Sequence, residues 1–148
     1  MTTSADASAA RARAWVGVGG QDVAMVTWEA MLAYCLAKAG AWRDEPWEGD
    51  VVVKVGPKIF AFLGSPGSAG VGLKCGSGRE EADEWRMRYP RDVKVSPYIG
   101  RSGWNVLAMN GAVPADELFE AVDESYALVV AGLPKKHRPQ PGETRPSE

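Results

Sequence analysis

The sequence predicts an α+β fold, a two-layer sandwich in which an antiparallel sheet of about five strands carries helices on one face. Apolar residues recur at helical spacing in three segments and alternate at strand spacing in others. Neighbouring strands that are joined by short turns should pair antiparallel, and three amphipathic helices need one sheet face to cover. The predicted order is α-β-β-β-α-β-β-α, within one domain of the 148-residue chain.

The first helix is predicted to begin at Thr27 and to end at Gly40. Its apolar residues fall at i, i+3, i+4, i+7, i+8 and i+11, so they form one stripe along the helix. These residues are Trp28, Met31, Leu32, Cys35, Leu36 and Ala39.

Two strand-like runs, 51–55 and 58–63, are joined by Gly56-Pro57. Proline holds its φ near −65°, which excludes a type I′ turn and suits a type II′ turn with Gly56 first. The hairpin would then pair Val55 with Lys58 and Val53 with Phe60. One face would hold Val53, Val55, Phe60 and Phe62, and the other would hold Lys54, Ile59 and Ala61.

A third strand is predicted at 71–75, with Lys74 on the face opposite its apolar residues. The next predicted element is a helix. The capping-box spacing of Ser77 and Glu80 predicts its start, and Pro90 predicts its end.

Two short strands and a long helix complete the predicted domain. The strands are expected at 93–95 and 104–109, and the helix begins at Pro114, a residue suited to a first turn. Its buried stripe comprises Leu118, Phe119, Val122, Tyr126, Val129, Val130 and Leu133.

The chain ends differ in composition from the domain expected at 25–133. Residues 1–24 are rich in small residues without periodicity, so they are predicted to be a flexible extension in which Trp15 is the one residue expected to dock. Residues 134–148 hold four prolines and no apolar side chain, which predicts a disordered tail.

Charge and cysteine content limit the function classes. The net charge is −2, and between residues 25 and 133 eleven Lys or Arg stand against fifteen Asp or Glu, which argues against a strongly basic surface. No apolar stretch approaches the ~20 residues that span a bilayer, and the N-terminus lacks the apolar centre of a secretory signal, so a cytoplasmic location without membrane contact is expected. Cys35 and Cys75 lie in apolar patterns and are expected to be packed thiols in a reducing compartment.

Catalytic and metal-binding patterns are weak. The single histidine, His137, lies in the predicted tail, and no phosphate-binding glycine loop follows a strand. Acidic residues at 80–84 match a helix N-terminus better than a metal site, and those at 44–50 are interpreted as a charged connection. The sequence therefore predicts no enzyme activity, no cofactor and no metal site.

The outer sheet face is the remaining candidate surface. Alternation places Lys54 and Lys74 on it, joined by Trp104 or Asn105 depending on the register of the last strand. Such a face could be solvated without a function, could dock a protein through its aromatic anchor, or could bind nucleic acid through lysines and a stacking ring.

Several short motifs within residues 25–136 resemble one family. They are the "KVGPKIFA" hairpin with Lys54, Lys58 and Phe60, "LKC" with Lys74, Tyr89-Pro90, Trp104-Asn105, and "SY…V…LPKK" at Ser125, Tyr126, Val129 and 133–136. As a set they resemble the MmcQ/YjbR family of small bacterial proteins.

The resemblance implies a fold grouped with frataxin-like (CyaY-like) and secretion-chaperone-like domains, and a non-enzymatic DNA-binding role. Phosphate contacts would come from the basic side chains, with a possible stacking ring beside them, and Ser125 and Tyr126 would serve packing. The alternative is a protein-interaction adaptor that uses the exposed sheet face. The candidate nucleic-acid-binding residues are Lys54, Lys58, Lys74, Lys94, Arg101, Trp104 and Asn105.

Overall fold

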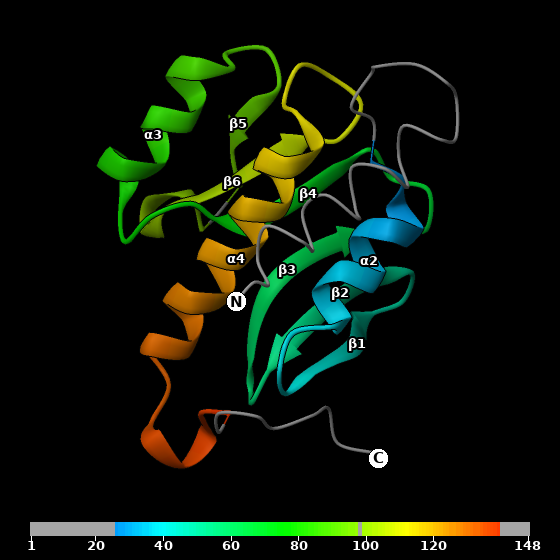
Figure 1. Ribbon diagram of the computed structural model, residues 1–148, viewed down its shortest axis with the longest axis vertical. Coiled ribbons are helices and arrows are strands. Elements are labelled where there is room, and N and C mark those ends of the chain that lie inside the picture. The colour runs from blue at the N-terminus through cyan, green and yellow to red at the C-terminus, as the bar shows by residue number, and fades with distance from the viewer. Residues whose placement is uncertain (1–25, 98, 140–148) are drawn as a thin grey trace.

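The computed structural model describes residues 26–97 and 99–139, and it confirms the predicted α+β fold class. One open antiparallel sheet has the strand order β1-β2-β3-β4-β6-β5, which is one strand more than the five or so expected. Three helices pack over one face of this sheet (Figure 1). The elements are α2 (Trp28–Leu36), β1 (Ala41–Trp47), β2 (Asp50–Val55), β3 (Lys58–Gly64), β4 (Gly70–Lys74), α3 (Arg79–Arg88), β5 (Val93–Val95), η1 (Gly100–Ser102), β6 (Trp104–Ala108), α4 (Ala115–Ala131) and η2 (Lys135–His137).

Strand β1 is the element that the sequence did not reveal. The acidic run at 44–50, interpreted as a charged connection, lies instead in β1, in β2 and in the turn between them. Strand β1 pairs only with β2, and of its seven residues only Ala41 is buried. An edge strand that exposes most of its side chains shows no alternation of apolar and polar residues, so periodicity does not detect it.

Two helix starts follow local chemistry. The Thr27 hydroxyl accepts a hydrogen bond of 3.1 Å from the Ala30 N–H, so the predicted start of α2 is confirmed. In α3 the N-cap is Gly78, and it is the Glu81 carboxylate that accepts hydrogen bonds from the backbone N–H and hydroxyl of Ser77. The predicted pairing of Ser77 with Glu80 is therefore wrong by one residue.

A bulge in β3 changes the predicted hairpin register. Val55 pairs with Lys58 as predicted, but Val53 pairs with Ala61, so Phe60 is an extra residue in the ladder. Phe60 and Ala61 consequently both join the core beneath the helices. Phe62 lies on the outer face, opposite to the prediction.

Helix α4 completes the ladder at this bulge. The buried Ser125 hydroxyl donates to the Phe60 carbonyl at 2.7 Å and accepts from the Lys74 N–H at 2.9 Å. One hydroxyl thereby satisfies backbone groups of β3 and β4 inside the core. The Tyr126 hydroxyl similarly donates to the Ala39 carbonyl at 2.5 Å. The packing and hydroxyl contacts that were expected for Ser125 and Tyr126 agree with these observations.

The predicted extension at 1–24, with Trp15, lies outside the described residues, as do residues 140–148 of the predicted tail. Residues 134–139 are described, and η2 lies at the end of the molecule where β2 meets β3 (Figure 1). A Cβ atom built at Gly56 would lie 3.3 Å from the His137 carbonyl oxygen. Within the described residues, no helix has both the length and the apolar character needed to cross a bilayer.

Candidate functional site

Strand pairing places two predicted lysines on the sheet face that the helices leave uncovered. Lys54 pairs with Trp42 on β1, and Lys74 pairs with Trp104 on β6. Directly paired residues project from the same face of a sheet, and the neighbours of these lysines along each strand are buried beneath the helices. Alternation therefore predicted the face of both lysines correctly.

The charge of Lys54 is compensated within the protein. Its ammonium group lies 2.8 Å from the Asp44 carboxylate and 5.1 Å from the centre of the Trp42 ring. The same contact lowers the pKa of Asp44, chiefly through the hydrogen bond from Lys54. A ligand phosphate would therefore compete with Asp44 for Lys54.

Lys74 and Trp104 have structural partners. The Lys74 ammonium donates to the Ser102 carbonyl, and partial burial lowers its pKa. Trp104 is only 9% exposed and stacks edge-on against Phe62, with ring centroids 5.3 Å apart. Little of this ring is accessible for stacking on a base.

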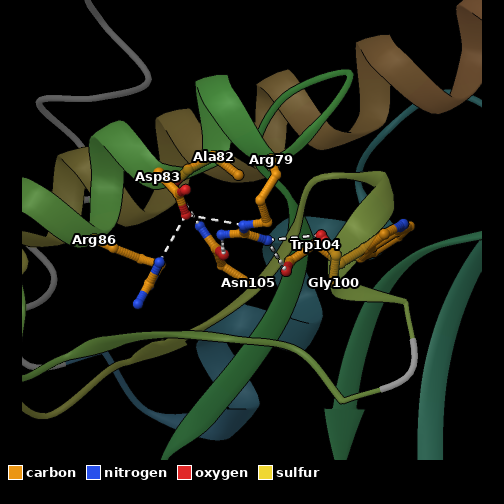
Figure 2. Close-up of polar contacts among 7 residues, drawn as sticks. All are labelled: Arg79, Ala82, Asp83, Arg86, Gly100, Trp104 and Asn105. Atoms are coloured by element: carbon orange, nitrogen blue, oxygen red, sulfur yellow. Dashed lines mark hydrogen bonds and ion pairs between the residues drawn. The ribbon is translucent and has the colours of Figure 1, made fainter.

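Asn105 points into the protein, beneath α3, and its side chain is fully buried. Its carbonyl oxygen accepts a hydrogen bond of 2.5 Å from the Arg79 guanidinium, and its amide donates to the Ala82 carbonyl at 2.9 Å (Figure 2). The same guanidinium donates to the carbonyls of Gly100 and Trp104. Asn105 thus joins α3 to β6 and is not presented to solvent.

Lys94 and Arg101 are exposed and form no ion pair with another described residue. Lys94 lies on β5, at the sheet edge opposite β1, and Arg101 lies in η1. Because β1 and β5 are the two outermost strands, Lys54 and Lys94 lie near opposite edges of the sheet. The predicted site residues therefore do not form one continuous patch.

A different grouping occurs where the β2–β3 hairpin turns. Lys58 lies at the tip of this turn, and η2, with Lys135 and Lys136, packs beside it through His137. Trp42 reaches the same turn, since its indole N–H donates to the Gly56 carbonyl at 2.9 Å. We call Trp42, Lys54, Lys58, Lys135 and Lys136 the hairpin end.

Contacts with the rest of the domain fix the η2 turn in place. Leu133 is buried, and the Arg138 guanidinium donates to the carbonyls of Leu133 at 2.8 Å and Ala131 at 3.0 Å. A cation at the C-terminus of α4 also matches the helix dipole. Lys135 and Lys136 are exposed, and neither they nor Lys58 forms an ion pair with a described residue.

Sequence reasoning missed three members of the hairpin end for two reasons. Lys135 and Lys136 fell in the predicted tail, although the "LPKK" motif had drawn attention to them, and Trp42 fell in a segment without periodicity. Their proximity to Lys58 depends on α4 returning the chain to the hairpin, which local patterns do not reveal.

Both cysteines are free and buried in the core, and burial raises the pKa of each thiol to about 12. A thiol of this kind is a poor nucleophile at neutral pH. Across the described parts of the chain, no group of three His, Cys, Asp or Glu residues is arranged to hold a metal ion.

Comparison with known proteins gives consistent results. The family model described as YjbR matches residues 36–128. "Uncharacterized protein YjbR" from Escherichia coli K12 is 28% identical over 116 residues, which cover 76% of this chain and 95% of that protein, and the protein of the same name from E. coli O157:H7 gives the same values. The crystal structure of Deinococcus radiodurans protein DR2400, which contains the domain DUF419, matches this structure with a TM-score of 0.65 at 23% sequence identity. The match covers 79% of this chain and 88% of that chain, and it shows a shared fold.

Proposed function

We propose that this chain, which belongs to the YjbR family, is a non-enzymatic protein that binds DNA through the hairpin end. A DNA-binding role is what the resemblance of the sequence to this family implied. The observation that supports this most is the set of Lys58, Lys135 and Lys136 around one turn, all exposed and without an ion pair to any residue that the structure describes. Ammonium groups gathered in this way can neutralise neighbouring phosphates.

The overall charge of −2 is compatible with this role because the cations are unevenly distributed. A local cluster of positive charge attracts a polyanion even on a weakly acidic protein, within the ~8 Å over which physiological salt leaves charges unscreened. Trp42, which is 40% exposed, offers a ring at the same end on which an unpaired base can stack. The three lysines would contact phosphates, which carry no sequence information directly, so we propose binding without sequence specificity.

The test is the salt dependence of binding to a labelled duplex of about 20 base pairs, measured by fluorescence anisotropy. Three neutralised phosphates predict that log K falls with log salt concentration with a slope of about −3. The triple variant K58A/K135A/K136A should reduce this slope to near zero and weaken binding at least tenfold at ~50 mM salt. All three side chains are exposed, so the variant should fold normally.

The double variant K94A/R101A is the matched control, because it removes two exposed cations that lie outside the hairpin end. It should leave both the slope and the affinity close to those of the parent protein. Loss of DNA binding in the control but not in the triple variant would assign the DNA contact to the β5 edge of the sheet. Undetectable binding by the parent protein at low salt would reject the DNA role and favour the protein-interaction adaptor.

A further inference from the structure

The outer sheet face contains a hollow of about 300 Å³, separate from the hairpin end. Phe62 and Val106 lie on either side of Gly72, and the segment after β5 contributes Pro97 and Ile99. Phe62 packs closely over Gly72, since a Cβ atom built at Gly72 would lie 3.2 Å from the Phe62 Cβ. The volume is near the lower limit of ordinary small-molecule sites.

Two polar groups of the hollow have no partner among the described residues. Asp50 is the one charged residue among the described residues that line it, and its carboxylate makes neither an ion pair nor a hydrogen bond with any of them. Ser96, only 6% exposed, also lines the hollow, and its hydroxyl has no protein partner within the described ranges. Buried polar groups normally have a hydrogen-bond partner, so an unpartnered hydroxyl in a concave site indicates room for a ligand or a water.

An exposed aromatic ring lies beside the carboxylate. Trp47 pairs directly with Asp50 across the β1–β2 turn, so the two side chains project from the same face, and Trp47 is 58% exposed. A carboxylate next to an indole is a combination that attracts organic cations through charge and through the ring face. The apolar walls would accept the hydrocarbon part of such a molecule.

We propose that this hollow binds a small organic amine, with its apolar body against Phe62 and Val106 and its ammonium group between Asp50 and Trp47. The inference does not depend on DNA binding, because Asp50 and Val55 lie at opposite ends of β2, ~17 Å apart at the usual rise per residue.

The experiment compares two probes that differ only in the charged group, tryptamine and the neutral alcohol tryptophol, by titration of the full chain at pH 7. Tryptamine should bind about fivefold more tightly, because only the ammonium interacts with the carboxylate and the ring. In Asp50→Asn the two affinities should become equal, with that of tryptophol unchanged. Asp44→Asn is the matched control and should preserve the fivefold difference, since Asp44 lies on the same face but is paired with Lys54 and does not line the hollow.

Amide chemical shifts of the unmodified protein give a second readout that requires no variant. Tryptamine should shift the resonances of Val106 and Ile99 and leave those of Lys135 and Lys136 in place. Equal affinity for the two probes, a loss of discrimination in Asp44→Asn as large as in Asp50→Asn, or shifts scattered away from the hollow would each overturn the proposal.

Discussion

Adjacent residues on one strand have unrelated roles in this protein. Trp104 lies on the outer face against Phe62, whereas Asn105 turns toward α3 and binds the Arg79 guanidinium. The sequence left open which of the two joins the outer face, because a shift of one residue in the register exchanges the faces. The pairing of Lys74 with Trp104 decides the question.

At this scale we predict that Asn105→Ala lowers stability by about 2–3 kcal/mol. The substitution removes the Asn105 partner of a partly buried guanidinium and of the Ala82 carbonyl, and a hydrogen bond to a charged group contributes more than a neutral one. Urea unfolding monitored by circular dichroism measures the loss, and Asn110→Ala, at an exposed position, is the control. A DNA affinity that falls while stability is unchanged would contradict the structural role of Asn105.

At the scale of elements, the β2–β3 hairpin shows how a strand irregularity and a distant helix depend on each other. The bulge places Phe60 and Ala61 on one side, and the Phe60 carbonyl then finds its partner in Ser125 of α4. The turn itself is supported from both sides, by the Trp42 indole and by η2. Hairpin, edge strand and C-terminal turn therefore form one packed unit.

The contact between the turn and η2 can be measured with two glycine substitutions. Gly49 and Gly56 both have positive φ, at 77° and 58°, so alanine should strain either turn by about 1–2 kcal/mol. A Cβ at Gly49 would meet nothing within 4 Å, whereas one at Gly56 would crowd His137. We therefore expect Gly56→Ala to lower the free energy of unfolding by roughly 0.5–1 kcal/mol more than Gly49→Ala, because the new methyl group would be packed too closely against η2. Thermal unfolding of the two variants measures the difference. Equal losses would show that η2 does not pack on the turn in solution.

At the scale of the whole molecule, the three helices and the sheet share one core, and both thiols are part of it. Cys35 on α2 and Cys75 after β4 are distant in sequence yet are both sealed from solvent. Ionisation of either thiol in the native state would place a charge inside this core.

This burial predicts a decline in stability at alkaline pH. The unfolded chain releases its thiol protons near pH 9, whereas the native protein retains them to about pH 12. Because the native state binds more protons in this interval, stability should fall as pH rises above 9, by up to about 1.4 kcal/mol per pH unit for each thiol. Urea midpoints between pH 7 and pH 10 measure the effect.

The control for this prediction is the double variant C35A/C75A, which retains the lysines and tyrosines that also titrate at alkaline pH. It should be less stable than the parent protein at pH 7 because of the lost volume, but it should lose less stability per pH unit above pH 9. Parallel pH profiles for the two proteins would show that the thiols are accessible in the native state.

The sequence by itself determined the fold class, the existence and order of the three helices and the outward direction of Lys54 and Lys74, because helical and strand periodicities are local properties of the chain. It did not determine the end of α2, which stops at Leu36 and not at Gly40 as predicted. It did not determine the edge strand β1, whose side chains are mostly exposed, or the bulge that turns Phe62 outward, which depends on contacts with α4. Only the tertiary structure decided that Asn105 is internal, that Asp44 compensates Lys54, and that η2 joins the hairpin. These features arise from pairs of residues distant in sequence, and no local pattern records which distant partner a side chain will meet.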